Sequence, residues 1–244
     1  MADWPEGVGR RLYPTLPSTN TEALRLARAG EATPLWVLAL EQTAGRGRRG
    51  NDWQGARGNF SASLAMRPDG PPAQAALRSF TAALALRDAL IAVCGRADIF
   101  TLKWPNDVLA KGRKIAGILL ESRDDTLCIG IGVNLATAPQ VPDAAFAPVS
   151  LRELTGMAPD PETFLAELAA AFAAREATFT TYGFAPIRTE WLAHAARLGE
   201  TVTARLASRT EVGVFGTIDE TGAIVLETAK GRLALPAAEI FFEG

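Results

Sequence analysis

The pattern of the chain changes at Gly199, and this change constrains the fold more than any other feature. Before it, apolar runs typical of strands alternate with alanine- and leucine-rich stretches of helical character, at residues 74–93 and 184–197. After it, only short apolar segments separated by turn residues remain, which predicts a small β-barrel of about 45 residues. The chain therefore divides into a first part with both helix and strand patterns and a small barrel after about residue 198.

Helix and strand signals divide the first part of the chain further. Thr19 and Glu22 have capping-box spacing, so a helix is expected to start there and to end before Gly30. Asp160-Pro161-Glu162 marks a second helix start. Lys111-Gly112-Arg113 lies between two apolar segments and predicts a hairpin turn. Strands are expected at residues 35–40, 60–66, 99–104, 108–110, 115–120 and 127–133.

Composition excludes several classes of protein. The net charge is −2, so a general affinity for nucleic acids is not expected. The chain has no apolar run of about 18 residues and no signal peptide, which favours a cytoplasmic protein without a membrane partner. With two cysteines and one histidine, neither a disulfide framework nor a Cys/His metal site is expected.

The segment Gly45-Arg46-Gly47-Arg48-Arg49-Gly50 combines three glycines with three arginines. Glycine lets the backbone approach a ligand closely, and arginine binds carboxylate or phosphate through two parallel hydrogen bonds. The spacing also fits a dinucleotide fingerprint and resembles a Walker A loop, but Asn51-Asp52 follows instead of a helix or a Lys-Ser/Thr pair. An RNA-binding arginine-glycine tract would normally repeat. A solvated surface loop is the remaining alternative.

Three other segments each have an ordinary structural explanation when taken alone. Lys103-Trp104-Pro105-Asn106-Asp107 would be a plain turn at a strand end, and Lys114-Ile115-Ala116-Gly117-Ile118-Leu119 a strand with a packing glycine. Ser18-Thr19-Asn20 would be a helix cap. Their chemistry agrees with the arginine-rich segment, however, because two lysines and three arginines would make a strong anion site.

Together and in this order, the segments resemble the motifs of the biotin–protein ligase family, also called biotin–acetyl-CoA-carboxylase ligases. The resemblance covers residues 18–134 in motifs and extends to the C-terminus in domain order. It depends on Ser18-Thr19-Asn20, on residues 42–50 with Trp53, on residues 103–107 and 114–119, and on Gly130-Ile131-Gly132-Val133-Asn134.

The resemblance implies both a fold and an activity. The fold would be an α/β catalytic domain with a mixed central sheet over residues 1–197, of the type shared with lipoyl ligases and class II aminoacyl-tRNA synthetases. An SH3-like barrel over residues 198–244 would follow. The enzyme would use ATP, with Mg²⁺, to convert biotin to biotinyl-5′-AMP. A lysine of the biotin carboxyl carrier protein would then take the biotin and release AMP. Positive charge is needed because the first step brings a carboxylate against a phosphate.

Site residues carry over from the same motifs. The resemblance implies catalytic roles for Lys103, Arg48 and Lys114. It implies biotin contacts for Ser18, Thr19, Asn20, Gln42, Arg46, Gly47, Arg48, Lys114 and Gly117. It implies ATP contacts for Arg48, Arg49, Trp53, Lys103, Asn106, Asp107 and Asn134. No residue is assigned as a direct metal ligand.

The sequence differs from the family pattern in two ways, and two alternative functions accompany the prediction. Only residues 1–17 precede Ser18, too few for the DNA-binding domain of bifunctional members, so a monofunctional ligase without a DNA partner is expected. Thr43 stands where some members have a second glutamine. A lipoate–protein ligase would share the reaction but not the arginine-rich segment, and a biotin-responsive regulator would not catalyse it. A monomer and a homodimer both remain open.

Overall fold

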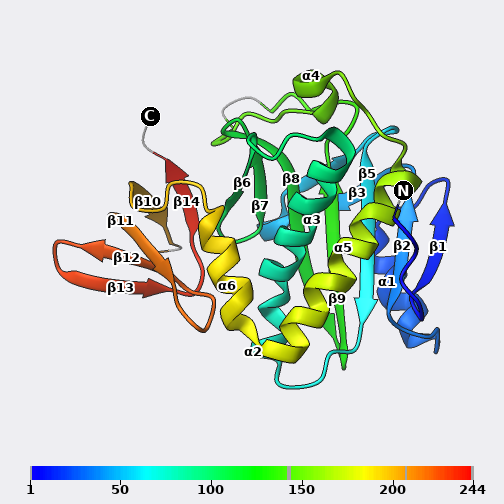
Figure 1. Cartoon of the computed structure of the whole chain (residues 1–244), viewed down its shortest axis with the longest axis horizontal. Helices are drawn as coiled ribbons and strands as arrows, with labels where there is room; N and C mark the ends of the chain where they lie inside the picture. The colour runs from blue at the N-terminus through cyan, green and yellow to red at the C-terminus, as the bar shows by residue number, and fades with distance from the viewer. Residues whose placement is uncertain (1, 142–143, 207, 243–244) are drawn as a thin grey trace.

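A seven-stranded mixed sheet forms the centre of the protein, shown in Figure 1. The computed structural model describes residues 2–141, 144–206 and 208–242. The strands are β1 (Gly9–Tyr13), β2 (Leu35–Ala39), β5 (Phe60–Met66), β6 (Phe100–Lys103), β7 (Asp107–Ala110), β8 (Arg113–Arg123) and β9 (Thr126–Val133). Their order in the sheet is β1-β2-β5-β9-β8-β7-β6. The strands expected from the apolar segments are all present.

Strands β6 to β9 form a run of antiparallel hairpins. In the β7–β8 turn, Lys111 and Gly112 both have positive φ, at 49° and 75°. Positive φ at both central residues is the geometry of the tight hairpin turn that suits the twist of two paired strands. The hairpin predicted from Lys111-Gly112-Arg113 is therefore confirmed.

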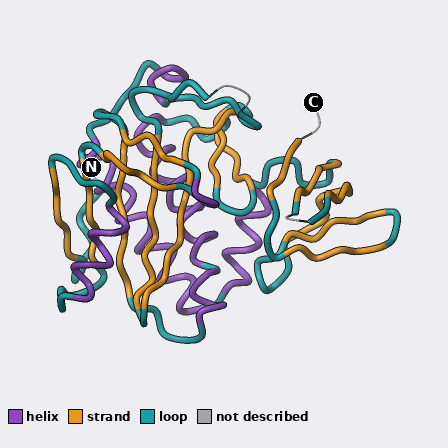
Figure 2. Tube along the Cα trace, turned by 180° about the vertical axis from the view of Figure 1, so that it is seen from behind, coloured by secondary structure: helices purple, strands orange, loops and turns teal. Residues whose placement is uncertain are grey.

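Helices cover both faces of this sheet, as Figures 1 and 2 show from opposite sides. They are α1 (Thr19–Arg28), α2 (Pro72–Ala76), α3 (Arg78–Cys94), α4 (Leu151–Thr155), α5 (Pro161–Tyr182) and α6 (Phe184–Ala193). Helices α3 and α5 pack on one face, where the rings of Phe60 and Phe164 meet edge to face at 5.0 Å. Helix α1 packs on the other face, against Val37 and Cys128.

The start of α1 differs from the prediction by one residue. Ser18, not Thr19, is the N-cap, and its hydroxyl accepts a hydrogen bond from the Thr21 backbone N–H at 3.4 Å. Glu22 consequently pairs with Arg25 instead of closing a capping box. The prediction at Asp160 is confirmed, since its carboxylate accepts from two backbone N–H groups of α5. The stretch expected as one helix over residues 74–93 is divided at Leu77 into α2 and α3.

The arginine-rich segment is not a simple loop. It forms a hairpin, the arginine hairpin, made of β3 (Gln42–Arg46) and β4 (Asp52–Gly55) around a short 3₁₀ turn at Arg48–Gly50. The two strands make a separate two-stranded sheet. The carbonyls of Leu16 and Pro17 accept hydrogen bonds from its base. The loop expected from the glycines is therefore corrected to a strand pair with a tight tip.

In the described residues of the C-terminal part, all regular elements are strands, as the change at Gly199 predicted. Its strands are β10 (Thr201–Arg205), β11 (Thr210–Ile218), β12 (Ile224–Thr228), β13 (Gly231–Leu235) and β14 (Glu239–Phe242). They form one antiparallel sheet in the order β13-β12-β11-β10-β14. The indole N–H of Trp104 donates to the Gly222 carbonyl at 3.0 Å and so joins this sheet to the turn after β6. No helix in the described part of the chain is long and apolar enough to cross a membrane.

Candidate active site

A cavity of about 170 Å³ lies where α1, the arginine hairpin, β8, β9 and the β6–β7 turn meet. Its wall brings together residues that are far apart in the sequence. Of the residues predicted for the site, it includes Ser18, Thr19, Asn20, Gln42, Arg46, Gly47, Arg48, Trp53, Lys103, Asn106, Asp107, Lys114 and Gly117. The motifs thus converge on a single cavity, although the roles assigned to individual residues stay predictions.

Of the other two predicted residues, one lies apart from this group and one has a side chain that the structure does not describe. Asn134 is buried away from the cavity wall, and its side-chain N–H donates to the Val149 carbonyl at 3.2 Å. Its contacts hold the segment after β9 in place. The side chain of Arg49 lies outside what the structure describes, so its predicted ATP contact stays a prediction.

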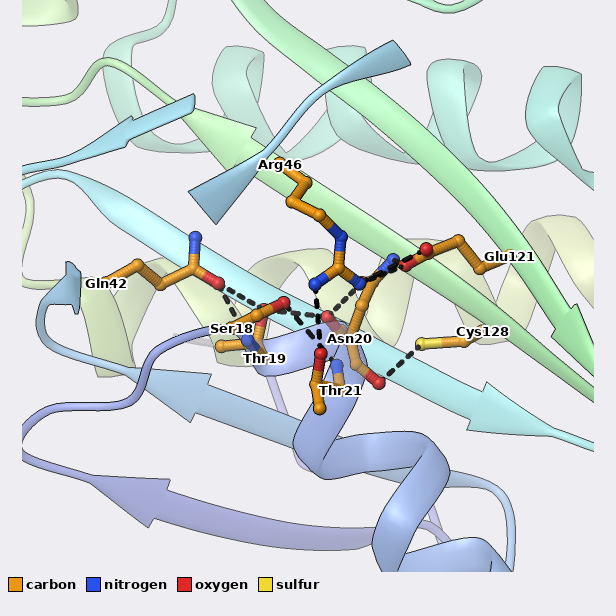
Figure 3. A network of polar contacts seen from close by, with 9 residues as sticks. Ser18, Thr19, Asn20, Thr21, Gln42, Arg46, Glu121 and Cys128 are labelled. Carbon is orange, nitrogen blue, oxygen red and sulfur yellow. Dashed lines mark hydrogen bonds and ion pairs between the residues drawn. The ribbon is translucent and has the colours of Figure 1, made fainter. Parts of the chain in front are cut away.

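At the first end of the cavity, uncharged polar side chains form hydrogen bonds to one another, in the network that Figure 3 shows together with the Arg46–Glu121 ion pair. The Thr19 backbone N–H and hydroxyl both donate to the side-chain carbonyl of Gln42, at 2.7 and 3.0 Å. The hydroxyl of Ser63 lies 2.7 Å from that of Thr19 and donates to the side-chain carbonyl of Asn20 at 2.5 Å. These bonds fix the polar atoms at the start of α1 before any ligand arrives.

Glu121 on β8 extends the same network and was not predicted. Its carboxylate accepts from the Asn20 amide at 2.6 Å and from the Arg46 guanidinium at 3.0 Å (Figure 3). Arg46 also donates to the hydroxyl of Thr21 at 3.1 Å. The sequence carries a signal for Glu121, because residues at even spacing from Gly117 share one face of the strand. Glu121 therefore connects the arginine hairpin to α1 and to the central sheet.

Two glycines on β9 create the space for this arrangement. A Cβ at Gly130 would lie 2.2 Å from the side-chain oxygen of Asn20, and one at Gly132 would lie 2.2 Å from the Trp53 ring. Gly132 pairs with Gly117 on β8, whose Cβ would be 3.5 Å from the same ring. Side chains at these positions would displace Asn20 or Trp53. Close packing thus explains the two β9 glycines of the sequence motifs, whereas a Cβ at Gly117 would make an ordinary contact.

The second end of the cavity carries positive charge. Lys103 is 5% exposed, and its ammonium lies 3.6 Å from the Asp107 carboxylate. Lys114 shares that carboxylate at 2.7 Å. Burial lowers the pKa of Lys103, and the Lys114 charge lowers it further, while Asp107 and Glu239 act in the opposite direction. The two ammonium groups place positive charge and N–H donors at this end of the cavity, which suits an anionic ligand.

The arginine hairpin reaches this cationic end through Arg48. Its guanidinium donates to the side-chain carbonyl of Asn106 at 3.2 Å. Asn106 in turn donates through its amide to the Ile118 carbonyl at 2.5 Å, so its orientation is fixed by β8. The tip of the hairpin consequently covers the cavity between its neutral and cationic ends.

A cavity with a neutral polar end and a cationic end can hold a ligand that joins a polar ring to an anion. It lies on a mixed sheet that is followed by a small all-strand unit, and two family models match these two parts of the chain. The family model of the biotin/lipoate A/B protein ligases matches residues 12–135, and the model of the biotin protein ligase C-terminal domain matches residues 198–243. The chain therefore belongs to the biotin/lipoate A/B protein ligase family.

Individual relatives agree with this assignment. The chain is 53% identical to the biotin–[acetyl-CoA-carboxylase] ligase of Paracoccus denitrificans, over 93% of this chain and 98% of that protein. It is 32% identical to the biotin–[acetyl-CoA-carboxylase] ligase of Mycobacterium tuberculosis, over 91% of this chain and 85% of that protein. The biotin protein ligase of Aquifex aeolicus in complex with biotin and ATP has the same fold, with a TM-score of 0.83, 24% identity and coverage of 95% and 97%.

Proposed function

We propose that this enzyme activates biotin with ATP to form biotinyl-5′-AMP and transfers the biotin to a lysine of the biotin carboxyl carrier protein of acetyl-CoA carboxylase. The observation that carries this proposal is the 53% identity, over nearly all of both chains, to a biotin–[acetyl-CoA-carboxylase] ligase. The cavity supports it, because its two ends match the two ends of biotin. The ureido ring is neutral and polar, and the valerate carboxylate is an anion.

Biotin lies in this proposal with its ureido ring at the start of α1. Ser18, Thr19, Asn20 and Gln42 are the polar side chains there, and Gly117 lets the ring approach the backbone of β8. The carboxylate then points along the cavity toward Lys114 and Lys103. Arg46 and Gly47 of the arginine hairpin cover the ligand from the open side.

In the first reaction, a biotin carboxylate oxygen attacks the α-phosphorus of ATP, a P–O bond forms, and pyrophosphate leaves. Lys103, Lys114 and Arg48 offset the repulsion between the two anions and the charge that develops on phosphorus. Trp53, Asn106, Asp107 and Arg49 are assigned to the nucleotide side, and Asn134 would act there only through the segment after β9 that it holds. In the second reaction, the lysine amine of the carrier attacks the acyl carbon and AMP leaves.

Mg²⁺ enters this proposal with ATP. Among the residues that the structure describes, no group of three or more His, Cys, Asp or Glu side chains is placed to hold a metal ion. Asp52, Asp107 and Glu239 are the carboxylates on the cavity wall, and Asp107 already contacts both lysines. This donor set fits an ion held mainly by the phosphates, as Mg²⁺ usually is. Such an ion would supply further charge neutralisation.

We also propose how the chain is organised and where it acts. Residues 1–197 would form the catalytic domain and residues 198–244 the C-terminal SH3-like domain. The net charge of −2 supports a ligase without a DNA partner. Two cysteines without a disulfide fit the cytoplasm. The unpaired edge of β1 could serve a homodimer.

The decisive experiment supplies purified protein with a carrier domain, biotin and ATP. Mass spectrometry should show one biotin added to one carrier lysine, and omission of ATP should abolish the addition. Lipoate in place of biotin tests the lipoate–protein ligase alternative, and lipoylation without biotinylation would reject our proposal. Tight biotin binding without ATP–pyrophosphate exchange and without transfer of biotin to the carrier would indicate a biotin-responsive regulator instead.

Replacement of Arg48 by glycine should weaken retention of the adenylate. The variant loses the contact to Asn106 and a bidentate phosphate donor, each a charge-assisted bond. We expect release of biotinyl-5′-AMP to accelerate by roughly 10-fold or more. A filter-binding chase with labelled adenylate measures this rate. Arg57→Gly is the matched control, because Arg57 pairs with Glu41 on the surface. Equal release rates in all three proteins would contradict a closing role for the hairpin.

A further inference from the structure

An aromatic ring lies against Lys103 on the side of the C-terminal sheet. The ammonium of Lys103 is 4.7 Å from the centroid of the Phe146 ring, within the range of a cation–π contact. Phe146 lies between β9 and α4, in a segment that the sequence motifs leave out. Asp107 is 3.6 Å from the same ammonium, which is longer than a hydrogen bond, and has its closer contact with Lys114.

Phe146 is itself held by the C-terminal sheet. Its ring meets that of Phe242 on β14 at 4.7 Å and 82°, an edge-to-face pair. Arg197 lies over the Phe242 ring at 5.5 Å and is tied to Glu200 at 2.6 Å. The row of contacts therefore begins at the junction between α6 and β10 and ends at the ammonium of Lys103.

We infer that Phe146 is a positioning residue for Lys103, and that Phe242 fixes Phe146 in place. This inference rests on the proposed function, in which Lys103 acts on the α-phosphate. It assigns a task to a phenylalanine outside the family motifs and to the last described strand.

The chemistry of the contact supports this assignment. A ring face attracts an ammonium group without accepting one of its protons in a strong hydrogen bond. A carboxylate in the same place would hold the protons and lower the net charge. Phe146 thus restrains Lys103 while its N–H groups stay available for a phosphate oxygen. The charged groups that act on Lys103 are Asp107, Lys114 and Glu239, and the ring adds attraction without another charge.

The test compares Phe146→Leu with Phe146→Tyr in biotin-dependent ATP–pyrophosphate exchange. Leucine keeps the site apolar but removes the ring, so we expect kcat to fall about 10-fold with the KM for biotin unchanged. Tyrosine keeps the ring face and should retain most of the activity. Phe242→Leu should lower kcat in the same direction by a smaller factor.

The pH profile separates positioning from a general structural effect. Without the ring, the charged form of Lys103 loses stabilisation while its burial persists, so the pKa of Lys103 falls further. Activity that needs the charged lysine is then lost at a lower pH, and the alkaline limb of the kcat profile should move to lower pH in Phe146→Leu. Phe146→Tyr should leave that limb in place.

Phe241→Leu is the matched control. Phe241 neighbours Phe242 on β14, but its ring lies under Arg205, at 4.4 Å, instead of against Phe146. Its exchange rate should equal that of the wild type, and thermal unfolding should show all variants folded. Wild-type kcat in Phe146→Leu, or an equal loss in Phe241→Leu, would overturn the inference. Absence of exchange in the wild-type enzyme would instead reject the proposed function.

Discussion

Replacement of Lys103 by methionine is expected to reduce formation of biotinyl-5′-AMP by roughly 100- to 1,000-fold. Methionine keeps the length and apolar stem of the side chain, so the buried site stays filled. It removes the one ammonium that lies between Asp107 and Phe146 in a nearly water-free position. A positive charge in a buried site stabilises the negative charge that develops on the phosphate much more than it would in water. Biotin-dependent ATP–pyrophosphate exchange measures the effect directly.

Lys230→Met is the control for Lys103→Met, since Lys230 lies on an exposed turn of the C-terminal sheet. Its exchange rate should equal that of the wild-type enzyme. Biotin binding by Lys103→Met, followed by calorimetry, should persist, because the ureido end of the cavity is untouched. An exchange rate for Lys103→Met within a few fold of the wild type would remove this lysine from the proposed chemistry.

The second large effect is expected for Gly130→Ala. The added methyl would lie 2.2 Å from the side-chain oxygen of Asn20. Asn20 has little room to retreat, because Ser63 and Glu121 hold its two amide atoms at 2.5 and 2.6 Å. We expect biotin affinity to fall by roughly 10- to 100-fold, the equivalent of a lost or misplaced buried hydrogen bond. Isothermal titration with biotin measures it.

Gly216→Ala provides the comparison for Gly130→Ala. Gly216 also lies within a strand, but its Cβ would meet a flexible Glu227 side chain at 3.3 Å. Biotin affinity should be unchanged there, and both variants should unfold cooperatively. Unchanged affinity in Gly130→Ala would mean that Asn20 does not contribute to biotin binding.

Much of the fold could be predicted because local signals agreed with it. Apolar runs such as Leu35–Ala39 became buried strands, and Asp160 capped α5 as its side chain indicates. The prediction of a loop over residues 45–50 was wrong for Gly45 and Arg46, which lie in β3, because glycine has low strand preference. The base of the hairpin also donates hydrogen bonds to the carbonyls of Leu16 and Pro17, which no local pattern reveals.

The candidate site was predictable to the extent that motifs bring their residues to one place. Partners on other elements could not be found this way. Ser63 and Glu121 reach Asn20 through sheet neighbours, and Phe146 reaches Lys103 from a segment without regular structure. Glu239 also lies on the cavity wall, although its strand, β14, is more than a hundred residues beyond Lys103 in the sequence. The even spacing from Gly117 indicates the face of β8 on which Glu121 lies, but its contact with Asn20 becomes visible only once strand order and register are known.

The separateness of the arginine hairpin has a consequence for how such an enzyme can change over time. The tip of the hairpin lies at the cavity and outside the central sheet, so it contributes little to global stability. Substitutions at its tip can therefore alter how long the reactive intermediate stays enclosed while leaving the melting temperature untouched. The residence time of the adenylate and the stability of the fold can therefore change independently. Enzymes that release the adenylate quickly or slowly can arise from the same fold through changes at a few residues of the hairpin tip.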